Sequence, residues 1–176
     1  MTTPRKAQVE KTDAISILTA DHKKVQKLFG DFAKLQESGS DAEKDELVSE
    51  ICTELTMHAD AEEAIFYPAV RAAIDDDDLM DEAEVEHQSA RDLIWQLQSL
   101  ESGSDRYDAK VTVLGEYIDH HVQEEQNEMF PKAKKADLDL EDLGEQILQF
   151  KNNWDETSMS TPRTEKSNKR TLGVTR

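Results

Sequence analysis

Two histidine–glutamate pairs in this sequence have a spacing that suits metal binding. His58 is followed four residues later by Glu62, and His121 is followed four residues later by Glu125. Residues four apart lie on one face of a helix, so both side chains can reach one ion, or the carboxylate can bridge two. Imidazole suits iron, zinc, copper and nickel, and a carboxylate adds a hard oxygen ligand for iron or manganese. A single pair would carry little weight, because 39 of the 176 residues are acidic.

The two pairs occupy equivalent positions in an internal duplication. Each copy begins with an acidic residue and a histidine, Asp21-His22 in the first and Glu86-His87 in the second. The same turn sequence, Glu-Ser-Gly-Ser-Asp, follows in both copies. A second helix-like stretch then carries the histidine–glutamate pair and reaches a proline ten positions after its histidine. A helix-turn-helix unit that occurs twice predicts four antiparallel helices.

The composition agrees with an all-α, up-down-up-down four-helix bundle. Gly and Pro number only 6 and 4, and the abundant Glu, Lys, Leu and Ala favour helices. Ser40 and Glu43 fit a capping box, and the run 75–78 would link the two halves. We predict disordered ends at 1–12 and 155–176 around a bundle domain at 13–154. The expected helices lie near 13–36, 41–73, 80–101 and 105–133, with a short C-terminal helix at 138–154.

Every expected bundle helix carries one histidine on its apolar stripe, where core residues recur at spacings of three and four. The stripes are Ile15, Leu18, His22, Val25, Phe29 and Phe32; Ile51, Leu55, His58, Glu62 and Ile65; Ala83, His87, Ala90, Ile94 and Leu97; and Val111, Leu114, Ile118, His121 and Glu125. All four histidines lie roughly 25–28 Å from their hairpin turns, at about 1.5 Å per residue. They should therefore meet in one layer.

Such a layer needs compensating charge, because a buried carboxylate without a partner costs several kcal/mol or more. Two cations would supply it. The predicted ligands are His22, His58, Glu62, His87, His121 and Glu125. His120 also has a glutamate, Glu124, four residues on, but the repeat aligns His58 with His121. His120 lies about 100° off the core stripe, so we expect it to be solvated or to contact a ligand from outside.

This pattern resembles the hemerythrin-like HHE cation-binding family over residues 13–133. The resemblance implies a four-helix bundle that holds two Fe ions, bridged by carboxylates and often by an oxo or hydroxo group. The oxygen-carrying members have a fifth histidine one turn from the third-helix ligand, whereas Ala83 and Arg91 stand one turn either side of His87 here. Counting ligands leaves one position open on each iron unless a tyrosine, a water or a nearby glutamate fills it. The nearby glutamates are Glu63, Glu86, Glu124 and Glu128.

Open positions favour chemistry at a small oxidant over simple oxygen carriage. The first hypothesis is a di-iron protein that binds or reduces oxygen, hydrogen peroxide or nitric oxide, with a catalase-like activity as one form of it. A second is an iron or oxygen sensor, or a stress-response interaction protein, whose folding depends on metal occupancy. A third is a structural or storage site for zinc or another ion. A ferritin-like site needs Glu-x-x-His on two helices, and only Glu84 with His87 fits that spacing.

The charge distribution limits the partners. Removing the net +2 of residues 1–12 and the net +4 of residues 158–176 from the formal −18 leaves −24 on residues 13–157. Such a body repels nucleic acid and anionic membranes and attracts cations, although the basic C-terminal segment could contact a protein partner. A single cysteine, Cys52, and the lack of any apolar run of about 20 residues lead us to expect a cytoplasmic protein.

Overall fold

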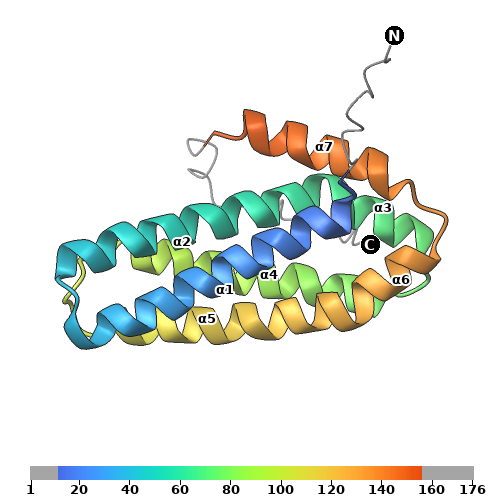
Figure 1. The fold of residues 1–176 in the computed structure, drawn as a ribbon. Coiled ribbons are helices and arrows are strands. Elements are labelled where there is room, and N and C mark those ends of the chain that lie inside the picture. The colour runs from blue at the N-terminus through green and yellow to red at the C-terminus, as the bar shows by residue number, and fades with distance from the viewer. Residues whose placement is uncertain (1–11, 156–176) are drawn as a thin grey trace, which may run out of the picture.

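The computed structural model describes residues 12–155, which form a four-helix bundle with one further helix across its side (Figure 1). The rods of the bundle are α1 (Ala14–Ser38); α2 (Asp41–Ala61), which continues through the π-helical turn η1 (Glu62–Phe66) into α3 (Tyr67–Ala73); α4 (Asp77–Gln98); and α5 (Tyr107–Glu124), which continues through η2 (Glu125–Met129) into α6 (Phe130–Lys135). The further helix is α7 (Leu140–Asn153). The predicted all-α, up-down-up-down fold is confirmed. The expected disordered ends fall, except for residues 12 and 155, outside the described range.

The first hairpin turn is fixed by the predicted capping box. The backbone N–H of Glu43 donates to Ser40 Oγ, and the backbone N–H of Ser40 donates to Glu43 Oε2 at 2.9 Å. The second turn differs, because α4 ends at Gln98, three residues before the predicted end of that helix. Gly103 there has φ +80°, a left-handed conformation that costs glycine little. The longer second loop is therefore only partly a copy of the first.

The link between the two halves is shorter than predicted. Asp76 caps α4, since its side chain accepts a hydrogen bond from the backbone N–H of Leu79. The helix consequently begins at Asp77, inside the run 75–78 that we expected to be a linker. Lys132 also donates to Asp76, at 2.6 Å, and so ties this corner to α6. Among the described residues, no helix is long and apolar enough to cross a membrane.

Two π-helical turns, which the sequence analysis did not predict, begin at Glu62 and Glu125. The backbone N–H after each turn donates to the carbonyl of the glutamate that starts it. A proline, which has no N–H to offer the regular ladder, comes two residues after each turn. The wide turn adds one residue and shifts the register. Phe66 is therefore fully buried, whereas Ile65, predicted for the core, is only partly buried.

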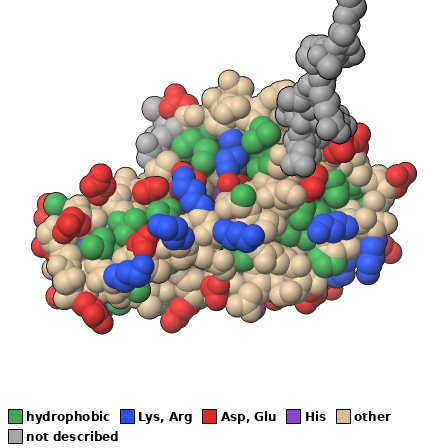
Figure 2. Space-filling model, viewed as in Figure 1, with side chains coloured by type: hydrophobic (Ala, Val, Ile, Leu, Met, Phe, Trp, Pro, Cys, Tyr) green, Lys and Arg blue, Asp and Glu red, His purple; other side chains and the backbone are tan. Residues whose placement is uncertain are grey.

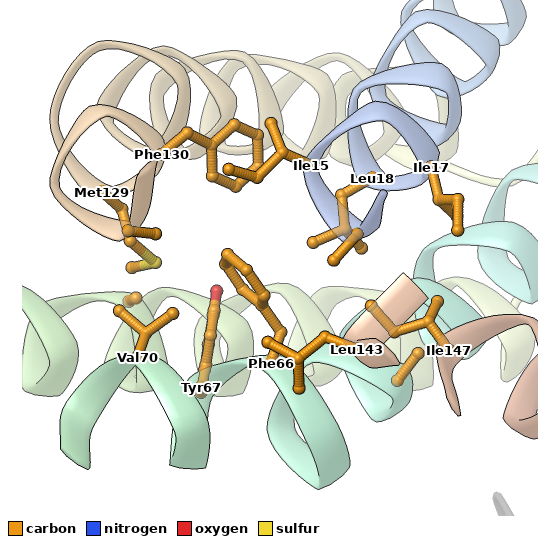
Figure 3. Packing of buried hydrophobic residues seen from close by; sticks show 14 of the residues in the cluster. Ile15, Ile17, Leu18, Phe66, Tyr67, Val70, Met129, Phe130, Leu143 and Ile147 are labelled. Carbon is orange, nitrogen blue, oxygen red and sulfur yellow. The ribbon is translucent and has the colours of Figure 1, made fainter. Parts of the chain in front are cut away.

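The apolar core consists of two clusters, one at each end of the bundle. The cluster at the hairpin end includes Val25, Leu55 and Cys52, and burial raises the pKa of the Cys52 thiol to about 12, as suits a small core residue. The cluster at the other end includes Leu18 and Phe66 (Figure 3). Along every bundle helix, the predicted ligands lie between these clusters. The polar layer is therefore sealed on both sides.

Helix α7 packs against α1, α2 and η1 and completes the second cluster (Figures 1 and 3). Leu143 and Ile147 are its buried anchors. Gly144 lies directly against the start of α1, where a side chain would not fit: an added Cβ would come within 2.4 Å of the Thr12 carbonyl oxygen. The predicted C-terminal helix is thus present and closely docked.

The close approach of α7 predicts opposite effects for two glycine substitutions. Gly144→Ala should lower the free energy of unfolding by about 1–3 kcal/mol, because the methyl group forces α7 away from α1. Gly30→Ala should raise it by about 0.5–1 kcal/mol, since an added Cβ there meets no atom within 4 Å and alanine is the better helix former. Urea denaturation measures both. Equal effects of the two variants would contradict the docking of α7.

Candidate metal centre

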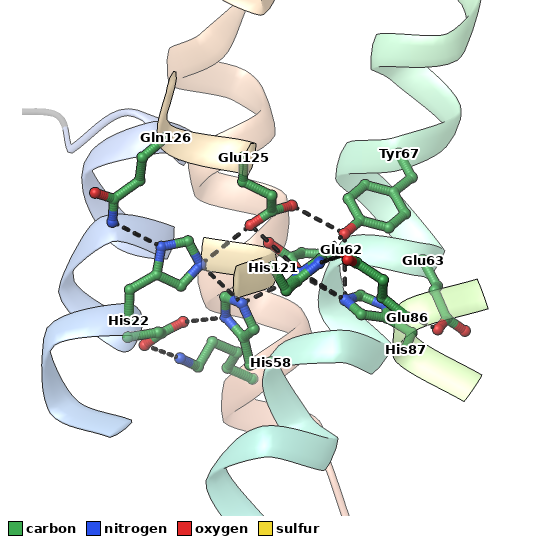
Figure 4. A network of polar contacts seen from close by, with 12 residues as sticks. His22, His58, Glu62, Glu63, Tyr67, Glu86, His87, His121, Glu125 and Gln126 are labelled. Carbon is green, nitrogen blue, oxygen red and sulfur yellow. Dashed lines mark hydrogen bonds and ion pairs between the residues drawn. The ribbon is translucent and has the colours of Figure 1, made fainter. Parts of the chain in front are cut away.

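Four imidazoles meet in the middle of the bundle, one from each of α1, α2, α4 and α5 (Figure 4). They form two pairs. The Nε2 atoms of His22 and His58 lie 3.1 Å apart, and so do those of His87 and His121. All four side chains are buried. The predicted convergence of the histidines in one layer is what the structure has.

Each glutamate reaches between the two histidine pairs. Glu62 Oε2 lies 3.2 Å from His58 Nε2 and 3.4 Å from His87 Nε2. Glu125 Oε2 lies 3.2 Å from His22 Nε2 and 3.7 Å from His121 Nε2. These short approaches lack hydrogen-bond geometry. Glu125 Oε2 and both carboxylate oxygens of Glu62 are therefore buried without a hydrogen-bond partner. Glu62 Oε2 and Glu125 Oε2 thus face imidazole nitrogens, and Glu62 Oε1 is buried with no group that satisfies it.

The ligand atoms fall into two overlapping sets, each with all its atoms within 4.8 Å of one another. The first set is His22, His58, Glu62 and Glu125, and the second is Glu62, His87 and His121. All six residues predicted from the sequence are therefore brought together, and the sets share a carboxylate. Two nitrogen–oxygen sets joined by a carboxylate fit a pair of cations, and this mixture of imidazole and carboxylate suits iron.

Every Nδ1 atom faces a polar partner outside the layer, which the sequence analysis missed. The contacts are His22 with Gln126 at 3.0 Å, His58 with Asp21 at 3.3 Å, His87 with Glu63 at 3.0 Å, and His121 with Glu86 at 2.7 Å. The three carboxylates accept from Nδ1–H, so they fix the ring and its tautomer and leave Nε2 of His58, His87 and His121 free for a metal. At His22 the amide nitrogen of Gln126 faces Nδ1 and holds the ring in place. The duplication carries a signal for them, because the partners directly precede the first histidine of each copy or directly follow each glutamate.

The sequence analysis proposed Glu63 and Glu86 as possible extra ligands, but the structure turns both toward Nδ1 atoms. Arg91 explains the position of Glu63: its guanidinium donates to Glu63 Oε1 at 2.8 Å and to Asp60 Oδ1 at 3.0 Å. Burial alone would raise the pKa of Glu63, but the hydrogen bonds from His87 and Arg91 lower it to about 2. Arg91 is no ligand, as expected, but it holds a partner of one.

Tyr67 is a site residue that the sequence analysis did not name. Its hydroxyl donates to Glu125 Oε1 at 2.9 Å and lies 3.2 Å from His87 Nε2. Burial, reinforced by the nearby carboxylates, raises the pKa of Tyr67 well above its usual value, so the hydroxyl keeps its proton. The equivalent residue in the first set is Phe130, which stacks on His22 with ring centroids 5.8 Å apart. The two sets are therefore chemically different.

His120 lies outside this layer. Its side chain is 63% exposed, and its Nε2 atom lies 3.5 Å from carboxylate oxygens of both Glu86 and Glu124. This position agrees with leaving His120 out of the predicted ligands. Glu124 faces His120 on the surface, and Glu128 contacts Lys132 at 3.9 Å. Neither contact places these glutamates in the buried layer.

A small cavity of about 20 Å³ adjoins the four imidazoles. Its apolar lining comes largely from residues on the hairpin side of the histidines, among them Val25, Leu55, Ile94 and Ile118. Glu62, Glu125 and Tyr67 lie on the opposite side of the layer. A volume of this size holds about one water-sized molecule. The space beside the imidazoles is therefore limited to a very small molecule.

The electrostatics of the layer set the protonation of its ligands. Burial lowers the pKa of His58 to about 4 even though Asp21 acts in the other direction, so this imidazole is neutral at neutral pH. Burial and the nearby Glu125 raise the pKa of Glu62. Burial would also raise the pKa of Glu125, but the surrounding histidines, His121 first, lower it. Without a cation, the layer therefore favours a proton on Glu62 over a proton on Glu125.

The raised pKa of Glu62 predicts a pH dependence of the metal-free chain. Between pH 4.5, its ordinary pKa, and the raised value, Glu62 binds more protons in the folded chain than in the unfolded chain. The contribution of Glu62 to the free energy of unfolding must therefore fall as the pH rises through this interval, against the opposite contribution of His58. Glu62→Gln, which mimics the protonated form, should remove the contribution of Glu62 and weaken iron binding. Denaturation across this pH range in the presence of a chelator measures the effect; identical slopes for both proteins would refute it.

Comparisons with known proteins agree with this geometry. Residues 13–133 match the family described as Hemerythrin HHE cation binding domain. A "DNA nickase" of Nostoc sp. (strain PCC 7120) is 27% identical over 135 residues, which are 77% of this chain but only 37% of that protein. The crystal structure of a hemerythrin HHE cation-binding domain-containing protein from Mycobacterium kansasii has the same fold, with a TM-score of 0.65 and 24% identity over 80% of this chain and 88% of that one. The chain therefore belongs to the hemerythrin HHE cation-binding domain family.

Proposed function

We propose that this protein holds two iron ions and that the pair binds or reduces a small oxidant, namely oxygen, hydrogen peroxide or nitric oxide. The observation that carries the proposal is the set of three buried carboxylate oxygens without hydrogen-bond partners, two of which lie within 3.7 Å of imidazole Nε2 atoms. Burying a charge without compensation costs several kcal/mol, and a pair of cations offsets that cost. The proposed ligands are His22, His58, Glu62, His87, His121 and Glu125.

In this proposal His22 and His58 would hold the first ion and His87 and His121 the second, with Glu62 and Glu125 available to both. When bound, the iron pair supplies the electrons that reduce the oxidant. The protein's own contribution is to hold the imidazoles by their Nδ1 atoms and to exclude bulk water. Tyr67 adds a hydroxyl that keeps its proton beside the second ion's ligands.

The cavity next to the imidazoles supports the small size of the proposed ligand. It holds about one water-sized molecule, and its lining beyond the site residues is largely apolar. An apolar wall does not compete for hydrogen bonds with a bound diatomic molecule. Larger organic substrates have no room there.

A second candidate function, a sensor of iron or oxygen, draws on the same burial. Six ionisable side chains packed in the core weaken the metal-free fold, and a cation that binds only the folded chain stabilises it by mass action. Metal occupancy would then change the stability of the bundle. A stress-response role and a cytoplasmic location belong to this proposal as well. A contact between the basic C-terminal segment and a protein partner stays a prediction outside the described residues.

The activity named for the Nostoc relative is not part of the proposal. Figure 2 shows a broken band of lysine and arginine side chains along one face of the bundle, with acidic side chains around it. Several lysines of α1 are paired with carboxylates, such as Lys24 with Glu54 at 2.7 Å and Lys27 with Asp31 at 2.6 Å. With a net charge of −24 on residues 13–157, the body repels phosphate groups.

Neighbouring histidines provide a direct test of the metal centre. The iron-loaded wild type should contain two irons per chain and show an absorption band in the visible or near-ultraviolet after oxidation. His121→Ala should lose iron and thermal stability together, because the lost ligand weakens binding that is also folding energy. His120→Ala, one residue earlier but exposed, should keep both. A colourless wild type without iron after growth in iron-rich medium would refute the proposal.

Tyr67→Phe tests the proposed chemistry. The variant keeps the ring and all six ligands, so its iron content should be unchanged. The rate at which the reduced, iron-loaded protein consumes hydrogen peroxide should fall about tenfold or more, since a positioned proton donor usually contributes at least that much. Tyr107→Phe is the matched control, because Tyr107 is also buried but donates to Asp45 at the hairpin end. Equal rates for Tyr67→Phe and wild type would exclude a role for the hydroxyl.

A further inference from the structure

Helix α7 supplies no ligand, yet it contacts the outer partner of His58. Lys151 Nζ donates to Asp21 Oδ1 at 2.5 Å, and Asp21 Oδ2 lies 3.3 Å from His58 Nδ1. Lys151 is only 15% exposed and Asp21 only 14%, so water screens this contact poorly. One short series of charged groups therefore connects α7 to the first histidine pair.

A second series of hydrogen-bonded groups connects the end of α7 to the other histidine pair, His87 and His121. The indole N–H of Trp154 donates to Asp60 Oδ2 at 2.9 Å, and Asp60 Oδ1 accepts from Arg91. Arg91 donates in turn to Glu63, which lies 3.0 Å from His87 Nδ1. Asp60 is on α2 and Arg91 on α4, so this series of contacts spans two bundle helices. It ends at His87, a histidine of the second set.

The two series of contacts each end at one histidine: the first at His58 of one pair and the second at His87 of the other. The outer partners of the other two histidines, Gln126 for His22 and Glu86 for His121, come from η2 and α4, and their contacts described above stay within the bundle. The apolar packing of α7 is separate from both series of contacts, because Leu143 and Ile147 face the apolar cluster that lies away from the hairpin turns (Figure 3). The polar contacts of Lys151 and Trp154 are therefore not needed simply to dock the helix.

We propose that α7 is a positioning element of the metal centre. Lys151 acts through Asp21 on His58, and Trp154 acts through Asp60, Arg91 and Glu63 on His87, so that docking of α7 sets how firmly each subsite retains its ion. The proposal rests on the metal centre proposed above. Its physical basis is that the group on Nδ1 orients a ligand imidazole and raises its basicity, and that a fixed counter-charge keeps that group in place.

The test is the rate at which iron leaves the full-length, iron-loaded protein, after anaerobic reduction, into an excess of ferrous chelator. Loss of a direct outer partner usually costs about 10–100-fold in metal affinity. Lys151 acts one contact farther out, so Lys151→Met should release iron about 3- to 10-fold faster than the wild type. Lys151→Arg, which keeps the charge, should restore most of the retention. Trp154→Phe should accelerate release of the ion at the other subsite, which gives a biphasic time course.

Lys44→Met is the matched control. Lys44 is 11% exposed and pairs with Asp108 at 2.7 Å, between α2 and α5 at the hairpin end. Lys44→Met should lower the melting temperature of the metal-free chain about as much as Lys151→Met does, without changing the rate of iron release. If Lys151 acts through Asp21, Asp21→Asn and the double variant Asp21→Asn/Lys151→Met should release iron at the same rate.

The outcomes separate the two proposals. If the wild type retains iron but Lys151→Met and Trp154→Phe release it at the rate of Lys44→Met, the positioning role of α7 is wrong and the metal centre stands. If both variants lose iron only in proportion to their lower melting temperatures, α7 is structural and the inference is again overturned. If the wild type binds no iron, both proposals fall.

Discussion

The structure depends on the burial of two carboxylates among four imidazoles at the centre of a helical bundle. In water these groups would be well solvated, but here the layer lies between two apolar clusters. Their mutual contacts leave three carboxylate oxygens unsatisfied. A bundle of this size can carry that cost only if something else stabilises it, and cations do so with the donor atoms present. If cations bind as proposed, binding and folding would therefore be coupled in this protein.

The internal duplication gives the centre an approximate symmetry, which particular side chains then break. Glu63 is equivalent to Gln126, and Tyr67 is equivalent to Phe130. The first set thus has an amide and an apolar ring, whereas the second has a carboxylate and a hydroxyl. Two cations bound there would differ in charge environment and in access to a proton donor.

The two π-helical turns connect the backbone to this chemistry. Each begins at a glutamate of the layer and ends just before an aromatic residue that contacts the site. The extra residue in the turn lets Glu62, Phe66 and Tyr67 all face the interior, which a regular helix would not allow. The prolines that follow remove the N–H groups that would favour regular α-helical bonding. A local backbone irregularity therefore provides both a proposed ligand and its neighbour.

The sequence by itself determined the helical fold, the duplication and the six residues that meet in the layer, because apolar periodicity and repeat alignment fix the face and the height of each side chain. It also kept His120 out of the layer for the same reason. Only the tertiary structure decided which groups face each Nδ1 atom, that Tyr67 joins the site and that Lys151 reaches Asp21. Those contacts join residues 20 to 130 positions apart, and their identity depends on helix packing and on the register shift at the π-helical turns. Periodicity in one helix carries no information about either.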